Sequence, residues 1–296
     1  MKLHFNNKLT LKTHLLFHFY VKLANNLASL HKHQFFINSH TSDVKVNLTK
    51  TTKITRVFRI SRVVLHTITG FLIAGLLLPI VNKKYKYKLI RWWCQQLLAA
   101  FNIKVIVSGD IPPDDLSHAM IIANHVSWAD IHVLNSVIPL RYIAKSDIRH
   151  WPIFGFFASR VNTLFVDRAK KQDALRIVDI TSACLEAGDR LCFFPEGTTT
   201  DGTSVLPFKS SLIEASIRSG TSIYPVAISY PLANGGINTE MAYAGDTTLK
   251  ESMQQALAIK SPIVNIHFLA PVSTKDQNRR ALAYHVHNLI TKQLKL

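Results

Sequence analysis

The chain has 296 residues, enough for one sizeable domain with an appendage and a substantial hydrophobic core. Its 35 Lys and Arg residues outnumber its 18 Asp and Glu residues, and the formal charge of +17 favours a polyanionic partner, either nucleic acid or an anionic lipid surface. The cysteines, Cys94, Cys184 and Cys192, are odd in number and show no Cys-x-x-Cys spacing. Composition therefore argues against a disulfide framework and against a structural zinc site.

Residues 1–60 are basic and rich in His, Asn, Lys and Thr, and they contain no motif that indicates a function. Two interpretations stay open: a poorly ordered extension, or a segment that does not belong to the functional core. The next segment, residues 61–100, is predicted to be helical and associated with a membrane. The remainder, residues 101–296, is predicted to be the catalytic domain.

The membrane prediction rests on residues 63–81, nineteen residues without a charged side chain. A helix of this length spans roughly 28 Å, close to the thickness of a bilayer core. Basic residues flank the run on both sides, and Trp92 and Trp93 suit a headgroup zone. The run indicates attachment to an anionic membrane, but it does not distinguish a spanning helix from one that lies in a single leaflet.

From residue 103 onward, short apolar runs alternate with helical patterns, which predicts an α/β fold with a mixed sheet flanked by helices. Strands are expected at 104–108, 119–123, 141–144, 163–166, 191–194, 222–229 and 263–269. Helices are expected at 129–137, 149–159, 170–187, 209–219 and 276–294. Gly188 and Gly220 follow two of these helices and are natural stops.

His125 and Asp130 follow the apolar run 120–123 directly. A neutral imidazole can take a proton from an alcohol near pH 7, and a carboxylate can hold the ring in the required tautomer. In a regular helix these two positions lie about 140° apart. The pair can therefore cooperate only if the chain bends between strand and helix. Asn124 is expected to cap the helix or to hold the His125–Asp130 pair in position without contacting substrate.

Two further loops follow apolar strands. Phe165-Val166-Asp167-Arg168 ends in a guanidinium that suits phosphate or carboxylate, although the segment by itself favours a surface salt bridge. The second loop, residues 193–202, reads FFPEGTTTDG. Its small residues and hydroxyls can cradle a phosphate, whereas an ordinary polar turn is the alternative.

Together these segments resemble the glycerol-phosphate acyltransferase family, whose members acylate lysophosphatidic acid and related lysolipids. Four family blocks occur in order: N-H-x-x-x-x-D at 124–130, an apolar strand ending in Arg168, F-P-E-G-T at 194–198, and an apolar run around Pro225. The stretch AKSDIRHWPIFGF, which contains Lys145 and Gly155, also resembles the family. The resemblance covers about residues 60–270.

The resemblance implies transfer of a fatty acyl group from a thioester donor, acyl-CoA or acyl carrier protein, to a lysolipid hydroxyl. His125 is then the general base and Asp130 its partner. The acceptor-binding residues would be Arg168, Glu196, Gly197, Thr198 and Lys145. No cofactor, metal ion or nucleic acid is expected. The expected location is the inner membrane, with the catalytic domain facing the cytoplasm.

The chain departs from the family in one place. Many members continue F-P-E-G-T with Arg and Ser, whereas this chain has Thr199 and Thr200. Loss of that guanidinium weakens the case for a doubly charged headgroup. The expected acceptor is 1-acylglycerol-3-phosphate, with a lyso-ornithine lipid or another lysophospholipid as the alternative.

Three rival interpretations are weaker. Ser127 could be a hydrolytic nucleophile, but the G-x-S-x-G turn that exposes such a serine is missing. His125, Asp130 and His132 could bind a metal, but no further ligand cluster follows. A non-enzymatic basic protein that binds membranes or nucleic acid is compatible with the charge, yet no recognition motif is present.

Overall fold

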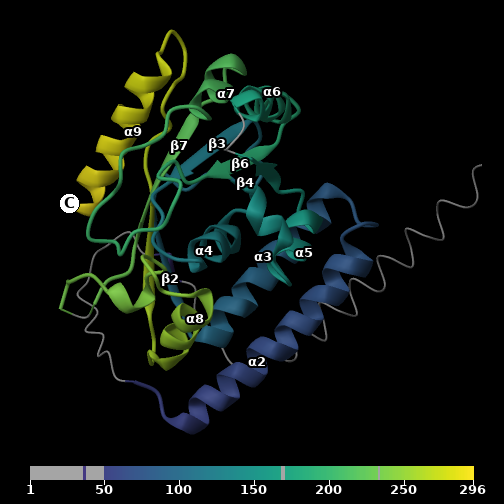
Figure 1. Ribbon diagram of the computed structural model, residues 1–296, viewed down its shortest axis with the longest axis vertical. Helices are drawn as coiled ribbons and strands as arrows, with labels where there is room; N and C mark the ends of the chain where they lie inside the picture. Colours follow the sequence, from purple (N-terminus) through teal and green to yellow (C-terminus); the bar gives the residue numbers. More distant parts are fainter. Residues whose placement is uncertain (1–35, 38–49, 168–170, 233) are drawn as a thin grey trace, which may run out of the picture.

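A mixed β-sheet between two layers of helices forms the body of the protein (Figure 1). The computed structural model describes residues 36–37, 50–167, 171–232 and 234–296. In these residues the strand order is β1-β2-β8-β7-β3-β6-β4-β5, and neighbouring strands are parallel except for β7 and β8. The strands are β1 (Phe36–Ile37), β2 (Lys104–Gly109), β3 (Ala119–Ala123), β4 (Arg141–Lys145), β5 (Leu164–Val166), β6 (Arg190–Phe193), β7 (Ile223–Ser229) and β8 (Ile263–Phe268). The predicted fold class is confirmed.

Each face of the sheet buries its own hydrophobic core. In β3, Ile121 points into the core on the side of α3, α4 and α8, whereas Met120 and Ile122 point to α6, α7 and α9. This alternation is the two-residue period of a strand that is covered on both faces. The helices of these layers are α3 (Lys83–Phe101), α4 (Ala129–Val137), α5 (Phe154–Arg160), α6 (Lys171–Glu186), α7 (Ile213–Arg218), α8 (Leu249–Ala258) and α9 (Arg279–Leu294).

The expected helices agree with the structure except in three places. The helix predicted at 149–159 is wrong as a single element, because a 3-10 turn (Ser146–His150) and α5 are separated at Pro152 and at Ile153, whose φ is 65°. The helix predicted at 209–219 is reduced to α7. Helix α8 was not predicted, although Thr248 and Glu251 form a capping box at its start.

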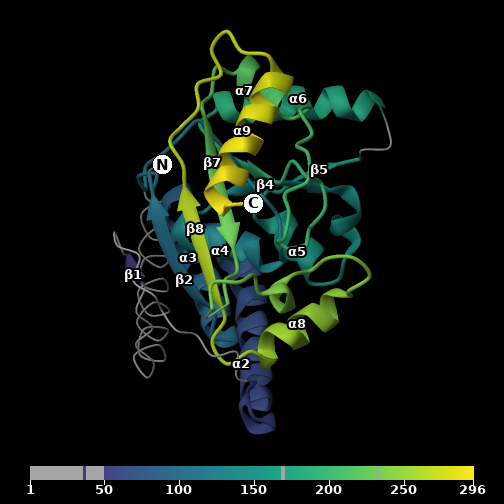
Figure 2. The same cartoon turned by 90° about the vertical axis from the view of Figure 1, so that its left-hand side faces the viewer.

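An N-terminal helical hairpin lies along one side of the domain, and its first helix extends beyond the sheet (Figure 2). Helix α2 (Lys53–Leu72) starts ten residues before the apolar run, continues through a π-helical turn (Ile73–Leu77) and ends before Pro79. Lys53–Leu77 is, in the part of the chain that is described, a helix long and apolar enough to cross a membrane. Gly70 allows α2 to approach α3 closely, since a Cβ there would lie 2.5 Å from Nε1 of Trp93.

Both ends of the hairpin are fastened to the α/β domain. At the start of α2, the buried guanidinium of Arg59 donates hydrogen bonds to the carbonyls of Leu257, Ile259 and Lys260, at the carboxyl end of α8. At the start of α3, Lys83 forms a 3.2 Å ion pair with Asp189. That ion pair is exposed and weak, but Ile73, Leu78 and Leu89 at the same end pack against Phe157 and Val161, so the hairpin is held at both ends.

Candidate active site

Three of the four sequence blocks meet at the carboxyl ends of adjacent parallel strands. Strand β3 pairs in parallel with β6 on one side and with β7 on the other. His125 follows β3, Glu196 follows β6, and Tyr230 follows β7. Open α/β sheets bind their ligands at this edge, because the loops that leave neighbouring strands converge there.

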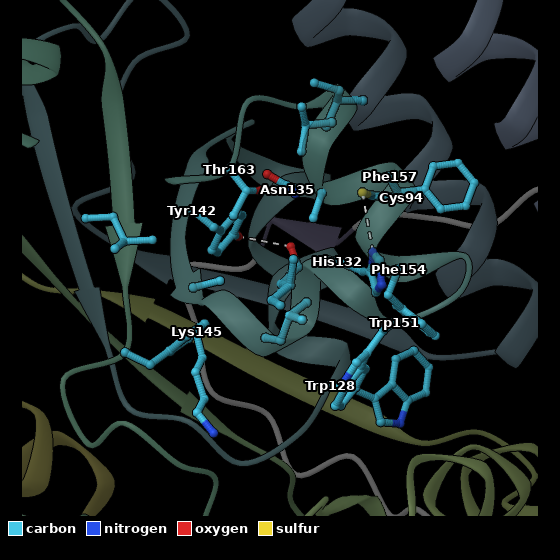
Figure 3. A pocket seen from close by; sticks show the side chains of 18 of the residues that line it. Cys94, Trp128, His132, Asn135, Tyr142, Lys145, Trp151, Phe154, Phe157 and Thr163 are labelled. Carbon is cyan, nitrogen blue, oxygen red and sulfur yellow. Dashed lines mark hydrogen bonds between the residues drawn. The ribbon is translucent and has the colours of Figure 1, made fainter. Parts of the chain in front are cut away.

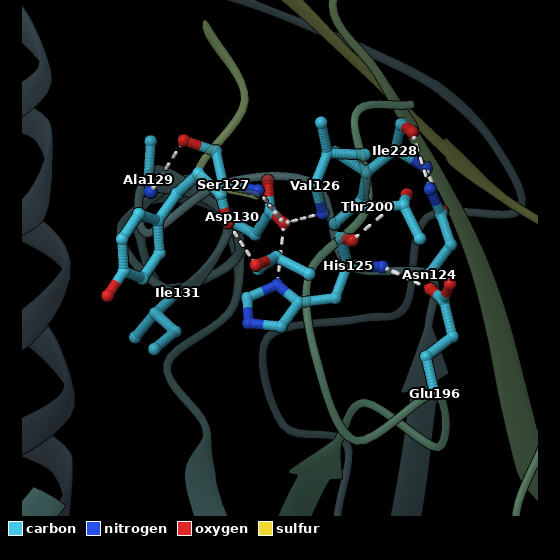
Figure 4. A network of polar contacts seen from close by, with 12 residues as sticks. Asn124, His125, Val126, Ser127, Ala129, Asp130, Ile131, Glu196, Thr200 and Ile228 are labelled. Atoms are coloured by element: carbon cyan, nitrogen blue, oxygen red, sulfur yellow. Dashed lines mark hydrogen bonds and ion pairs between the residues drawn. The ribbon is translucent and has the colours of Figure 1, made fainter. Parts of the chain in front are cut away.

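The bend that the sequence required is present between β3 and α4. Strand β3 ends at Ala123 and α4 begins at Ala129, so His125 lies in the connecting turn and Asp130 in the first turn of the helix. Nδ1 of His125 lies 2.8 Å from Oδ2 of Asp130 (Figure 4). A carboxylate accepts, so it selects the tautomer that carries the proton on Nδ1 and leaves Nε2 as an acceptor.

Asp130 is completely buried and is held by four donors. Besides His125, the backbone N–H groups of Val126 and Ser127 donate to Oδ2 at 2.8 and 2.9 Å. The hydroxyl of Tyr230 donates to Oδ1 at 2.6 Å. Burial, and then the charge of Asp130, raise the pKa of Tyr230 well above its usual value, so the phenol keeps the proton that it donates.

Tyr230 was not predicted from the sequence. Its signal was present but weak: it is a polar residue directly after the apolar strand of the fourth block. Only the strand order shows that this strand lies beside β3. The structure thus adds a third side chain to the His125–Asp130 pair.

Glu196 holds the backbone of the turn. Its two carboxylate oxygens accept from the N–H of His125 at 2.7 Å and from the N–H of Leu206 at 2.8 Å. The backbone carbonyl of His125 is also held, because it accepts from the N–H of Thr200 at 2.9 Å. Burial raises the pKa of Glu196 above its usual value, and the two backbone hydrogen bonds oppose that rise.

These contacts change the role expected for Glu196. Its side chain is buried and does not line the cavity beside His125, whereas Gly197 and Thr198 do. Gly197 has a φ of 77°, a conformation that glycine adopts without strain and that turns the chain back at the end of the block. Glu196 was expected to contact the acceptor. In the structure its side chain instead links the backbone of the first block to that of the third.

The side chain of Asn124 neither caps α4 nor hydrogen-bonds to His125 or Asp130 in the described part of the chain. Its amide donates to the carbonyl of Ile228 and accepts from the N–H of the same residue, at 2.9 and 2.8 Å. The side chain thereby continues the pairing of β3 with β7 one residue beyond β3. Asn124 fixes the position at which the chain leaves the sheet.

The residues of two rival interpretations lie elsewhere. Ser127 is fully buried and its hydroxyl accepts from the N–H of Ala129, so it does not face the cavity as a nucleophile would. His132 does not join His125 and Asp130, because its Nδ1 contacts Sγ of Cys94 instead.

A cavity of about 510 Å³ opens beside His125 (Figure 3). Phe194 stacks on the imidazole with ring centroids 3.8 Å apart and an interplanar angle of 8°, which fixes the plane of the ring. From there the cavity extends between the helical hairpin, α4 and α5. Most of its wall is apolar, with Ile73, Leu78, Leu89, Trp93, Phe154, Phe157 and Val161 among the lining residues.

Lys145 lies at the rim of this cavity, and Arg168 falls outside the described residues. Lys145 is 62% exposed and forms an ion pair with Asp147, which also lines the cavity. Within the part of the chain that is described, Lys145 is the one Lys or Arg side chain that borders the cavity. Thr199, the first residue after the F-P-E-G-T block, also borders the cavity and donates its hydroxyl proton to the carbonyl of Tyr243.

Comparison with known proteins agrees with this geometry. A family model described as Acyltransferase matches residues 104–229. The lyso-ornithine lipid O-acyltransferase of Pseudomonas aeruginosa is 34% identical over 198 residues, which are 67% of this chain and 75% of that protein. The 1-acyl-sn-glycerol-3-phosphate acyltransferase of Neisseria meningitidis serogroup B is 30% identical over 184 residues, 62% of this chain and 71% of that protein.

A solved structure shares the fold. The crystal structure of the 1-acyl-sn-glycerophosphate acyltransferase PlsC from Thermotoga maritima superposes with a TM-score of 0.64 at 19% sequence identity. The match covers 82% of this chain and 94% of that chain. The ordered blocks, the site that they form and the identity to these relatives together show that the chain belongs to the acyltransferase family and is an acyltransferase.

Proposed function

We propose that the protein transfers a fatty acyl group from a thioester to the free hydroxyl of a lysolipid, with His125 as general base. One observation carries the proposal: His125, paired with the buried Asp130, borders an apolar cavity. Nε2 of His125 has no hydrogen-bond partner among the described residues, and the residue borders that cavity. A basic nitrogen beside an apolar chamber suits proton removal from an alcohol next to a lipid chain.

The proposed reaction needs no covalent enzyme intermediate. The acceptor hydroxyl loses its proton to Nε2 while its oxygen attacks the thioester carbonyl. The C–S bond then breaks, and the imidazolium returns the proton to the departing thiolate, so that an ester and a free thiol leave. Asp130 steadies the transient positive charge on His125, and Tyr230 and the two backbone N–H groups keep Asp130 in place.

The donor chain is proposed to occupy the cavity. A thioester of coenzyme A or acyl carrier protein arrives from water, so its acyl chain needs an apolar chamber when it reaches His125. The wall formed by the hairpin, α4 and α5 provides one of about 510 Å³. The chain of the lysolipid can stay in the bilayer, and only its headgroup and hydroxyl need to reach the rim.

Two acceptor classes fit the rim, 1-acylglycerol-3-phosphate and lyso-ornithine lipid. Relatives named for each activity match the chain. Thr199 favours the second class, because its hydroxyl is used by the carbonyl of Tyr243 and it provides no positive charge for a phosphate. Arg168 and Lys145 are the proposed cations for either headgroup.

Attachment to one leaflet is the proposed mode of membrane binding. Helix α2 and the π-helical turn that continues it expose a row of large apolar side chains on one face: Ile54, Val57, Phe58, Val64, Leu65, Ile68, Leu72 and Leu76. Both ends of the hairpin are tied to the catalytic domain, by Arg59 and by Lys83. A helix fixed in this way keeps both ends on the same side of the bilayer, so it lies in the interface rather than across it. In the cell we place the domain on the cytoplasmic face of the inner membrane.

The test uses purified full-length protein with mixed vesicles. Acyl-CoA and acyl carrier protein thioesters are each offered with 1-acylglycerol-3-phosphate and with lyso-ornithine lipid, and ester formation is measured. We expect transfer to at least one acceptor, and loss of roughly a thousandfold or more in His125→Ala and Asp130→Asn proteins that retain the wild-type circular dichroism. Near-wild-type turnover by folded His125→Ala protein contradicts the assignment of the base.

A further inference from the structure

A polar cluster interrupts the apolar wall of the cavity. Cys94 of α3 and His132 and Asn135 of α4 all border it (Figure 3). Sγ of Cys94 lies 3.8 Å from Nδ1 of His132. His132 and Asn135 are three residues apart on the helix and therefore present side chains to the same face. The proposed reaction at His125 uses none of the three.

The cluster is electrically neutral. Burial lowers the pKa of His132 to about 4, and the charge of His66 acts in the same direction. Burial also raises the pKa of Cys94 above its usual range, while a side-chain hydrogen bond with Asn135 opposes that rise. Near neutral pH the cluster is thus an uncharged imidazole, a thiol and an amide, and it provides hydrogen-bonding groups without attracting an ion.

His132 keeps one ring nitrogen available. Nδ1 is engaged with Cys94, whereas Nε2 has no hydrogen-bond partner in the described part of the chain. Nε2 is not one of the buried side-chain atoms that lack a partner, so it is accessible from the cavity. The edges of Trp93 and Trp128 flank the ring, with centroids 5.7 and 6.0 Å away. The accessible surface of His132 is therefore part of the cavity wall.

A plain hydrocarbon chain in this cavity would take water away from Nε2 without replacing its hydrogen bond. Leaving a buried polar atom unpaired costs about a factor of ten or more in affinity. A hydroxyl group both donates and accepts, so it pairs with Nε2 in either tautomer of the imidazole. A carbonyl or ether oxygen only accepts, so it pairs with Nε2 only in the tautomer that carries the proton on Nε2.

We propose that Cys94, His132 and Asn135 form a subsite for a hydroxyl group on the acyl chain that occupies the cavity. The inference rests on the proposed function only in taking this cavity as the acyl-chain site. His132 provides the hydrogen bond, Cys94 holds the ring through Nδ1, and Asn135 in turn hydrogen-bonds to Cys94 and to the N–H of Leu140. The subsite distinguishes hydroxylated chains from unsubstituted chains of the same length.

Binding to the full-length protein tests the subsite without requiring turnover. A fluorescent fatty-acid probe in the cavity is displaced by an unsubstituted fatty acid and by a positional series of monohydroxylated acids of equal length. We expect one position in the series to bind about tenfold more tightly than the unsubstituted acid. His132→Phe should abolish that preference and His132→Gln, which keeps a neutral hydrogen-bonding group, should retain it. Ile131→Leu, an apolar change in the same wall, is the matched control.

Two outcomes overturn the inference: equal binding across the series, or a preference that survives in folded His132→Phe protein. His132→Leu replaces the phenylalanine variant if that protein does not fold. Ester formation then identifies the source of the chain, since the hydroxylated chain is offered either on the thioester or on the lysolipid. If binding shows the preference but no thioester supports transfer, the proposed function fails and the subsite stands.

Discussion

The hydroxyl of Tyr230 donates a 2.6 Å hydrogen bond to Oδ1 of Asp130, across 100 residues of sequence. Asp130 uses its other oxygen for His125 and for the N–H groups of Val126 and Ser127. The carboxylate is thereby fixed in position by groups from β7, from the turn and from the imidazole itself. The orientation of the proposed general base thus depends on the loops that follow two neighbouring strands rather than on the sequence block alone.

Tyr230→Phe should lower kcat about tenfold and leave the KM for the acceptor unchanged, because Asp130 loses one of its four donors but no substrate contact is removed. A carboxylate with one donor fewer is more basic and stabilises the protonated imidazole. The acid limb of the pH–rate profile should therefore move to higher pH. Tyr142, Cys192 and Glu196 are the other titratable groups whose charges couple to Asp130.

The control for this variant is Tyr142→Phe. The hydroxyl of Tyr142 donates to the carbonyl of Ile131 at 3.1 Å and makes no hydrogen bond with Asp130. Its loss should leave the acid limb in place. An unchanged profile in Tyr230→Phe would show that the phenol is only a packing residue.

Glu196→Gln separates a structural role from contact with the acceptor. The amide can accept from only one of the N–H groups of His125 and Leu206 and presents its own donors to the other. We expect a loss of about 1–3 kcal/mol in the free energy of unfolding and a lower kcat. Denaturant titration and steady-state kinetics measure the two effects, with the more exposed Glu214→Gln as the control. A raised KM at unchanged stability and kcat would instead return Glu196 to the headgroup site.

The cations assigned to the headgroup should affect acceptor affinity. Arg168→Ala is expected to raise the KM for the acceptor roughly tenfold, the value of a charge-assisted hydrogen bond, without loss of fold. Lys145→Ala should raise it only about threefold, since exposed ion pairs are weak. Asp147→Asn, which frees Lys145 from its ion pair, should lower the KM. If all three variants keep the wild-type KM, the headgroup binds elsewhere.

The exposed face of α2 should govern attachment to vesicles. Leu65→Glu is expected to weaken binding to anionic vesicles by about tenfold or more, because burying a leucine side chain in the interface contributes roughly 1.5–3 kcal/mol. Leu175→Glu on α6 is the matched control, since Leu65 and Leu175 are both 64% exposed. Co-sedimentation measures the affinity. Equal losses in the two variants would mean that α2 has no special part in attachment.

His132 should make the fold sensitive to acid. Its pKa is lowered from 6.5 to about 4, so the unfolded chain binds this proton more readily than the folded protein does. The neutral imidazole makes its full contribution to the free energy of unfolding above pH 6.5. That contribution is lost as the pH falls towards 4, and the loss at pH 5 is about 2 kcal/mol. His132→Gln should therefore lose less stability than the wild type between pH 7 and pH 5 in denaturant titrations. Equal losses would show that His132 titrates normally.

Much of the fold could be predicted from the sequence because the signals are local. The buried strand Ala119–Ala123 is an uninterrupted apolar run, and α6 and α7 end at glycines with positive φ, Gly188 and Gly220. The bend between His125 and Asp130 also followed from local geometry, since a regular helix would keep the two side chains apart. Block order and spacing were enough to indicate the family, because three of the four blocks place polar residues directly after an apolar strand.

The tertiary structure decided which distant groups meet. Tyr230 reaches Asp130 only because β7 lies beside β3, and Glu196 meets the backbone of His125 because β6 lies on the other side. Cys94 and His132 become one cluster through the packing of α3 on α4. Hydrogen bonds of this kind depend on strand order and helix docking, which result from the summed burial of many side chains. No local pattern contains that information, so the sequence alone indicated His125 as the candidate base and the structure revealed what holds it.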